Sequence, residues 1–155
     1  MKKKVLIIII CILILIVSII VLKPKKDGKL ICTYKYKDQD ITITTKYIVN
    51  YKNKYVTNLK TIEKITSDNQ TILIEYRDKL KENYSLYNDI KYYDNKVRLI
   101  QNTVTSTTEI NYNKIDINKL IELDKNNKYL FEDKKIHLNK FKELYKKNGA
   151  KCKYK

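Results

Sequence analysis

LICTYKYKDQDITITTKYIVNYKNKYVTNLKTIEKI, residues 30–65, is the stretch that decides the fold, because apolar and polar side chains alternate through most of it. Alternation with a period of two is typical of β-strands, whose successive side chains point to opposite faces of a sheet. Polar turn residues interrupt the alternation at 37–40 and at 51–54. The segment therefore predicts an antiparallel meander of three strands, which run from Leu30 to Tyr36, from Ile41 to Val49 and from Tyr55 to Ile65.

After the third strand the period changes to that of a helix. Thr66, Ser67 and Asp68 are candidate N-cap residues. Apolar and aromatic residues then follow at spacings of three and four, which places them on one helical face. They are Leu73, Tyr76, Leu80, Tyr84 and Tyr87. We expect this helix to cover one side of the sheet.

The second half of the chain predicts a hairpin followed by a short helix. Asp89–Tyr93 and Val97–Tyr112 read as two strands joined by a turn at Asp94–Lys96. Asp116 then stands where it can cap a short helix. The apolar residues of that helix are Ile117, Leu120, Ile121 and Leu123.

A last helix is expected from about His137 to the glycine at 149, a natural helix stop that returns Cys152 toward the domain. Its inward residues are Leu138, Phe141, Leu144 and Tyr145. The predicted fold class is α+β. It consists of an N-terminal transmembrane helix followed by an antiparallel sheet of about five strands, packed with two or three helices.

Residues 5–22 form an unbroken apolar run that predicts the transmembrane helix. Only Cys11 and Ser18 in this run are not Val, Ile or Leu. As a helix, these 18 residues span roughly 27 Å, close to the hydrocarbon thickness of a bilayer. No small residues suited to signal cleavage precede Pro24. We therefore expect an uncleaved signal anchor that contacts the lipid bilayer through residues 5–22.

Cys11 raises the alternative of a lipid-modified cysteine. A lipoprotein signal needs a small residue directly before the acylated cysteine, whereas Ile8–Ile10 precede Cys11. We interpret Cys11 as an ordinary apolar residue of the anchor, with acylation left open as the alternative.

The anchor divides the chain into three parts. These are an anchor with a basic N-terminus (1–22), a linker that holds the only proline (23–29) and one α+β domain (30–155). Three lysines stand on each side of the apolar run, so the positive-inside rule nearly cancels. Because the N-terminus is short, we expect it to stay in the cytoplasm while the domain is translocated. The predicted location is the cell membrane, single-pass, with an extracytoplasmic domain.

Two cysteines lie outside the anchor, and they bracket the domain. Cys32 stands at its start and Cys152 near its end. In an oxidising compartment a bridge between them closes nearly the whole domain and removes on the order of 4 to 5 kcal/mol of unfolded-state entropy. Two unrelated free thiols are the alternative. No CxxC motif or Cys/His cluster indicates zinc or redox chemistry.

The chain is strongly basic, with 33 Lys and Arg against 17 Asp and Glu and a formal net charge of +16. Only Arg77 and Arg98 are arginine, the residue that usually supplies bidentate phosphate and guanine contacts. The lysines are scattered through every segment, and an AT-rich coding bias explains their excess without a ligand. Specific nucleic-acid binding is therefore not expected. Convergence of the lysines on one face would instead favour a polyanion binder.

Five segments share their order and pattern with one protein family. They are the Cys32–Tyr34 strand, the Asn53–Thr57 turn into a strand, the Asp94–Val97 hairpin, Tyr112–Leu120 and the ending Lys147–Cys152. With them the domain resembles the YehR-like small lipoproteins and their membrane-anchored relatives in low-GC bacteria, although this chain lacks a lipobox. The resemblance implies an α+β domain at the outer face of the membrane. It implies no catalytic residue, because that family has no established activity.

The chemistry-bearing residues predict no enzyme. His137 is the only histidine, and we expect it to cap a helix rather than act as a general base. The GxSxG, P-loop, GxGxxG and HExxH motifs are absent. Glu132 and Asp133 stand beside two lysines and lack the ligand spacing of a calcium loop. We predict no catalytic, cofactor-binding or metal-binding residue, no cofactor and no small-molecule substrate.

Fourteen tyrosines interleave in places with lysine, as in Tyr34–Lys37 and Lys91–Tyr93. This pattern suits packing within a sheet or a stacking surface for sugars or nucleic acid, and we favour packing.

Two functions follow from the sequence. The first is a membrane-anchored extracytoplasmic interaction or structural module with an unknown cell-envelope partner. The second is a membrane-tethered basic domain that binds polyanions, either nucleic acid or an anionic wall polymer.

Overall fold

The three predicted strands form the centre of the sheet. The computed structural model describes residues 26–155, apart from the side chains of residues 126 and 127. In it β1 (Asp27–Asp38), β2 (Ile41–Lys52) and β3 (Tyr55–Thr66) pair in sequence, each antiparallel to the next. The predicted meander is confirmed, and β1 begins inside the segment predicted as a linker.

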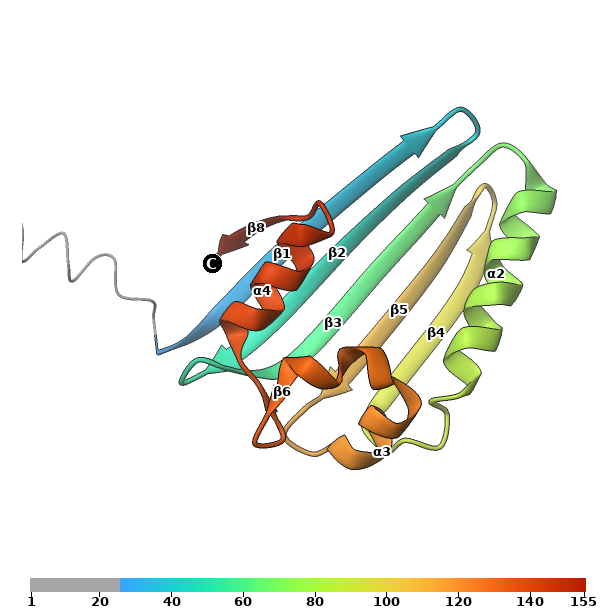
Figure 1. Cartoon of the computed structure of the whole chain (residues 1–155). Coiled ribbons are helices and arrows are strands. Elements are labelled where there is room, and N and C mark those ends of the chain that lie inside the picture. The colour runs from blue at the N-terminus through green and yellow to red at the C-terminus, as the bar shows by residue number, and fades with distance from the viewer. Residues whose placement is uncertain (1–25) are drawn as a thin grey trace, which may run out of the picture.

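The complete sheet has six antiparallel strands in the order β4-β5-β3-β2-β1-β8 (Figure 1). β4 (Tyr93–Ile100) and β5 (Thr103–Asn111) extend it on one side, and β8 (Lys151–Tyr154) pairs with β1 on the other. A separate two-stranded ribbon is formed by β6 (Phe131–Glu132) and β7 (Lys135–Ile136). The fold-class prediction of about five strands is therefore wrong. The sixth strand was missed because four residues after a helix stop show no extended alternation.

The predicted hairpin turn at residues 94–96 is also wrong. These residues lie within β4, and the chain turns instead between Ile100 and Thr103, where Gln101 has a φ of 49°. Asn95 and its neighbours were mistaken for a turn because of their polar character. In the structure the Asn95 amide donates hydrogen bonds to the hydroxyls of Ser106 and Thr108 on the neighbouring strand.

The helices all pack on one face of the sheet, which we call the inner face (Figure 1). They are α2 (Gln70–Ser85), α3 (Ile117–Leu123) and α4 (Leu138–Lys147), with a 3-10 turn η1 (Lys125–Leu130). Asp116 caps α3 and His137 caps α4 as predicted, the first accepting from two backbone N–H groups and the second from one. The cap of α2 is Asn69 rather than one of the three preceding residues. Gly149 follows α4 with a φ of 85°, a conformation that suits glycine.

Two separate hydrophobic clusters lie between the helices and the inner face. The larger cluster packs α3 and α4 against residues of β1, β2, β3 and β5. Its buried members include Leu30, Leu59 and Phe141. The smaller joins α2 to the far half of the sheet through Ile65, Leu73 and Val104. The inner face is therefore covered from two sides, by two groups of helices.

The predicted membrane span at residues 5–22 lies outside the described residues. Among residues 26–155, no helix is both long enough and apolar enough to cross a bilayer. The transmembrane part of the fold-class prediction therefore has no counterpart in the described structure.

Candidate functional site

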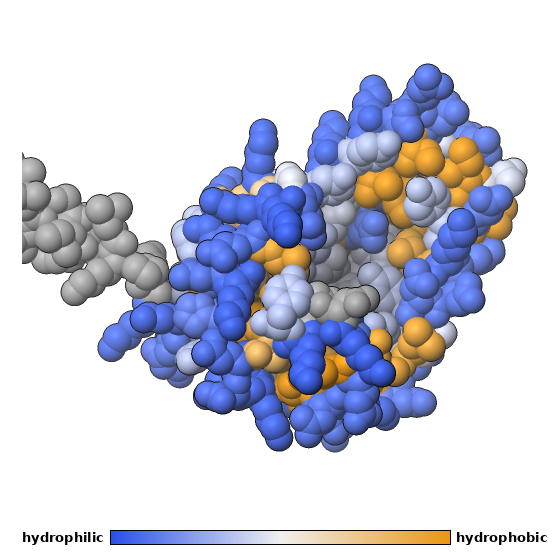
Figure 2. All heavy atoms as spheres, viewed as in Figure 1, coloured by the Kyte–Doolittle hydropathy of each residue, from blue (hydrophilic) through white to orange (hydrophobic). Residues whose placement is uncertain are grey.

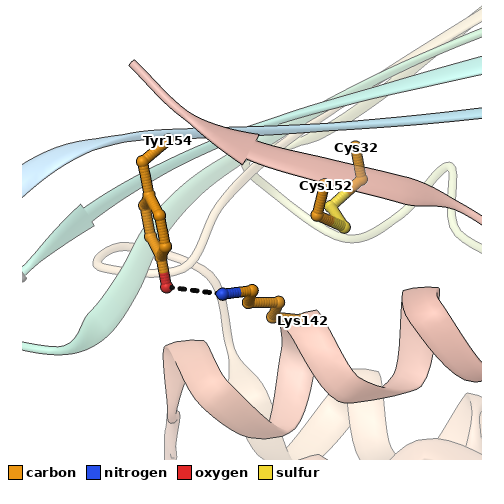
Figure 3. The surroundings of a disulfide bond; sticks show 4 residues. All are labelled: Cys32, Lys142, Cys152 and Tyr154. Atoms are coloured by element: carbon orange, nitrogen blue, oxygen red, sulfur yellow. Dashed lines mark hydrogen bonds between the residues drawn. A yellow bond between two sulfur atoms is a disulfide. The ribbon is translucent and has the colours of Figure 1, made fainter.

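The predicted bridge between Cys32 and Cys152 is present (Figure 3). The two cysteines are register partners on β1 and β8, with their Cα atoms 4.0 Å apart. Their side chains lie on the inner face beneath α4, and Cys32 is fully buried. Beside the bridge, Lys142 Nζ of α4 lies 3.4 Å from the Tyr154 hydroxyl and 4.5 Å from the centre of the same ring. The bridge thus fixes the C-terminal strand to the sheet edge.

The two residue groups that the sequence weighed for catalysis or metal binding occupy structural positions. His137 Nδ1 accepts a hydrogen bond from the Asn139 N–H at 3.3 Å, and its ring packs edge-on against Tyr55. Glu132 pairs with Lys140 at 3.1 Å, and Asp133 lies in the turn between β6 and β7 with a φ of 50°. Among residues 26–155 no group of three or more His, Cys, Asp or Glu side chains is placed to hold a metal ion.

Several tyrosines pack between the helices and the inner face. Tyr87 and Tyr93 stack with ring centres 4.7 Å apart, and Tyr145 of α4 contacts both Tyr47 and Phe141. Burial raises the pKa of Tyr93 and Tyr145 far above the usual tyrosine value. These rings fill core positions, as expected for a chain without tryptophan.

The Tyr–Lys interleaving at residues 34–37 does not form one mixed surface. Because β1 is a strand, Tyr34 and Tyr36 lie on the inner face, whereas Lys35 and Lys37 lie on the opposite side of the sheet. We call this opposite side the outer face. No described helix packs on it, and most of its residues are exposed or half-buried, although Ile31 is buried.

Basic residues converge on the outer face in two neighbouring rows that run across the strands. Strand register defines both rows. The first row is Lys151, Thr33, Lys46, Ile62, Thr107 and Lys96, and the second is Lys35, Thr44, Lys64, Thr105 and Arg98. We call these eleven residues the basic rows. They contain six cations and no acidic residue.

The cations of the basic rows are staggered. Lys46 and Lys64 on adjacent strands belong to different rows, so a threonine or isoleucine stands directly beside each of them. Successive cations within a row are two or three strands apart, or about 10 to 14 Å, and the rows themselves are separated by about 7 Å. Residues of like charge therefore never stand directly opposite one another, which limits their mutual repulsion.

None of the six cations has an ion-pair partner among residues 26–155, and all six are exposed. The next row toward the start of β1 differs. There Lys60 pairs with Glu109 at 2.7 Å, and Asp94 lies beside Glu109 on the edge strand. Lys29, Lys37 and Lys153 on the outer face are also exposed and unpaired among residues 26–155, but each stands in a row with no second unpaired cation, so the basic rows are the part of this face where such cations recur.

The basic rows border a concave region of about 690 Å³. Its lining includes four of the six cations together with Thr33, Thr44 and Ile62 of the basic rows, and also Tyr34, Thr45 and Gly149. The cations are Lys35, Lys46, Lys64 and Lys151. The threonine hydroxyls can donate or accept hydrogen bonds, while the lysines supply point charges on flexible stems. This arrangement suits an anion that is extended across the strands.

Sequence reasoning missed the basic rows because their members are far apart along the chain. Lys151 and Lys46 come into one row, with Thr33 between them, only when β8 adds to the sheet edge. The available signal was the recurrence of lysine at every second position, as in Lys35 and Lys37 or Lys151 and Lys153. The pairing register was needed to combine these short patterns into one surface.

No protein-family model matches the chain, and no curated protein matches it. Two solved structures, both determined by NMR, are similar in fold. A protein from Streptococcus pneumoniae TIGR4 has 17% sequence identity and a TM-score of 0.53, covering 81% of this chain and 84% of that chain. The YehR protein of E. coli has 15% identity and a TM-score of 0.52, covering 81% of this chain and 91% of that one. The domain therefore has a YehR-like fold.

Proposed function

We propose that this chain is a membrane-anchored, extracytoplasmic interaction module whose basic rows bind a linear, phosphate-bearing polymer of the cell envelope. The observation that carries the proposal is the convergence of six unpaired cations on an uncovered sheet face. Scattered surface lysines would show no such convergence. The proposal joins the two functions considered from the sequence, because it gives the interaction module a partner of defined charge.

Two observations support an extracytoplasmic location at the membrane. The apolar run at residues 5–22 is long enough to anchor the chain in a bilayer. The bridge between Cys32 and Cys152 is of a kind that persists in oxidising compartments and is rare in the cytosol. The YehR-like fold adds the further proposal that the chain is a membrane-anchored relative of that lipoprotein family.

The composition of the basic rows favours a phosphate polymer over nucleic acid. Proteins that bind single strands of nucleic acid place aromatic rings beside the backbone groove so that bases can stack. The basic rows hold no aromatic residue and one arginine, Arg98, and a single tyrosine, Tyr34, lines the concave region beside them. They offer charge and hydroxyl groups, which match a phosphate chain without bases. The concavity also suits a chain better than the flat surface of a bilayer.

The test is binding of polyphosphate to the full chain in nanodiscs of zwitterionic lipid, measured at several salt concentrations. The test variant changes Lys35, Lys46, Lys64 and Lys151 to Gln. A matched control changes four exposed lysines away from the outer face, Lys79, Lys81, Lys128 and Lys147, so that both variants lose the same charge.

We expect the test variant to bind at least tenfold more weakly and with a shallower salt dependence. If all four lysines contact phosphates, the slope of log K against log salt falls by about 3, taking roughly 0.7 per contact from single-stranded nucleic acids. The control should stay within about twofold of the native chain. Equal losses in both variants would show that only net charge matters and would overturn the proposal. Tighter binding of single-stranded DNA or of anionic vesicles than of polyphosphate would also contradict it.

The location is tested separately by thiol labelling of intact cells with a membrane-impermeant alkylating reagent. Labelling of Cys32 and Cys152 only after reduction supports an extracytoplasmic, bridged domain. Labelling that requires opening the cells would contradict the proposed topology.

A further inference from the structure

The inner face carries two rows at its centre that are rich in polar residues, which we call the polar rows, although Cys32, Tyr34 and Tyr47 belong to the larger hydrophobic cluster and Val97 packs against the smaller one. Register defines them as Cys32, Tyr47, Thr61, Thr108 and Asn95, and as Tyr34, Thr45, Glu63, Ser106 and Val97. The neighbouring rows on either side are apolar, with Leu59 in one and Ile65 in the other. Burying polar side chains under helices costs free energy unless they are hydrogen-bonded, so these rows indicate that the centre of the inner face is not fully covered.

The helices leave only part of these polar rows accessible: Thr61, Glu63 and Asn95 are half-buried, whereas Thr45, Ser106 and Thr108 are buried. The smaller cluster attaches α2 to one side of the inner face, and the larger cluster attaches α3 and α4 to the other. Figure 2 shows a hollow between the two groups of helices, with pale, weakly polar residues in it and hydrophobic patches around it. We call this hollow the inner groove, and register places the half-buried members of the polar rows, Thr61 and Glu63 among them, on the sheet face that the helices flank.

Glu63 lies at the middle of the polar rows, on the central strand β3, and it is half-buried. Its register neighbours are Thr45 and Ser106, both buried and uncharged. Among residues 26–155 no basic group pairs with it, and burial raises the pKa of its carboxyl. A carboxylate in this position is an acceptor that lacks a matching donor.

Unlike Glu63, the polar side chains of β4 and β5 in these rows are hydrogen-bonded to one another. Asn95 donates to Ser106 Oγ at 3.1 Å and to Thr108 Oγ1 at 2.8 Å, so the β4–β5 side of the polar rows is internally satisfied. The open hydrogen-bonding capacity is therefore concentrated around Glu63 and its neighbour Thr61.

Half-exposed tyrosine rings border the groove from both sides. Tyr34 and Tyr47 come from the sheet, while Tyr76 and Tyr84 come from α2. Tyr47 on β2 lies one row from Glu63 on the adjacent strand β3, and its ring also contacts Tyr145 of α4. Tyrosine offers a flat ring for packing together with a hydroxyl for hydrogen bonding.

We propose that the inner groove binds a neutral saccharide, whose hydroxyl groups donate to the Glu63 carboxylate and to the neighbouring Thr61 while its ring packs on the bordering tyrosines. A sugar ring has several hydroxyl groups, which can donate to an unpaired acceptor such as Glu63. It also has apolar C–H faces, which can pack on aromatic rings. A peptide strand is a poorer match, because strands add to sheet edges and the polar rows lie in the middle of a sheet. The site is on the opposite side of the sheet from the basic rows and is independent of the function proposed for them.

The experiment uses saturation-transfer NMR on the full chain in nanodiscs of zwitterionic lipid, with the tetramer of N-acetylglucosamine as the probe. Glu63→Gln keeps the size of the side chain and removes its charge, and we expect at least tenfold weaker binding. Thr61→Val removes one hydroxyl and should weaken binding several-fold. Glu143→Gln on the exposed surface of α4 is the matched control and should leave binding unchanged.

Folding of the variants is checked by thermal melting, where Glu63→Gln should be at least as stable as the native chain because it removes a half-buried, unpaired charge. The fourfold Lys→Gln variant of the basic rows should retain saccharide binding. Absence of probe binding at millimolar concentration, or unchanged binding by Glu63→Gln, would overturn the proposal. Binding of the deacetylated tetramer alone would likewise overturn it, in favour of a site for amines.

Discussion

The two faces of the sheet are made from alternate residues of the same strands, yet they differ in almost every respect. The inner face has two hydrophobic clusters separated by polar rows, with helices over each cluster. The outer face has no described helix over it and carries unpaired lysines at alternating positions. Because adjacent residues of a strand point to opposite faces, one set of residues can build the core while the alternate set stays available for a partner.

The comparison also explains how so basic a domain can fold. Like charges that lie in one plane repel one another, but the register separates the cations of the basic rows by threonine and isoleucine. The inner face supplies the burial that offsets this repulsion, through fully buried residues such as Leu30, Val49 and Phe141. Four experiments test how far the two faces are independent.

The largest effect on stability is expected at the sheet edge, where the disulfide joins β1 to β8. Replacing Cys32 and Cys152 with Ser removes a bridge with a sequence separation of 120 residues. We expect a loss of roughly 4 to 5 kcal/mol in the free energy of unfolding, because the unfolded chain regains its loop entropy. Urea unfolding of the full chain measures the loss. Native protein under reducing conditions is the control, and a loss below about 1 kcal/mol would contradict the expectation.

A second experiment compares one apolar residue from each face of β3. Leu59 is buried in the larger cluster, whereas Ile62 is half-buried on the outer face. Leu59→Ala should cost about 3 kcal/mol of unfolding free energy because it leaves a cavity, while Ile62→Ala should cost about 1 kcal/mol or less. Urea unfolding of the two variants side by side gives the difference. Similar costs would mean that the outer face is covered in solution.

A third experiment compares the neighbours Asn95 and Lys96 on β4. Asn95→Ala leaves the buried hydroxyls of Ser106 and Thr108 without their shared donor, and we expect a loss of about 2 kcal/mol. Lys96→Ala on the outer face should change stability by about 0.5 kcal/mol or less. Thermal unfolding monitored by circular dichroism measures both. An equally small effect at Asn95 would show that water replaces the lost hydrogen bonds.

The smallest effect concerns the pH dependence of stability at Glu63. Burial raises the pKa of this carboxyl in the folded state, so its ionised form destabilises the fold once the pH is above the folded pKa. Glu63→Gln should therefore melt at a higher temperature than the native chain at pH 7. The difference should shrink as the pH falls toward about 4.3, the ordinary value for glutamate. A difference that is constant with pH would show that the ionisation of Glu63 is not its cause.

Local patterns were enough to predict the meander, the helix faces and two of the helix caps. The two-residue alternation from Leu30 and the three-to-four-residue spacing from Leu73 each arise because one face of a single strand or helix is buried. Such a pattern is visible in the sequence without knowledge of the tertiary structure. The bridge could be proposed because only two cysteines lie outside the anchor.

The errors and omissions arose where long-range pairing decides the structure. Asp94–Lys96 resembles a turn, but pairing with β5 makes it strand, and β8 exists only because β1 offers it an edge. The basic rows and the inner groove escaped prediction for the same reason. Lys46 and Lys151, or Glu63 and Ser106, are distant in sequence and share a surface only through register.

The most direct test of the central claim, that the outer face is the interaction surface, is a 15N-labelled NMR titration of the full chain in nanodiscs with polyphosphate. We predict that the amide shifts concentrate in the basic rows, at Thr33, Lys35, Thr44, Lys46, Lys64 and Lys151, with little change in α2 and α4. Shifts spread evenly over lysines on all sides of the domain, or centred on the helices, would contradict the account.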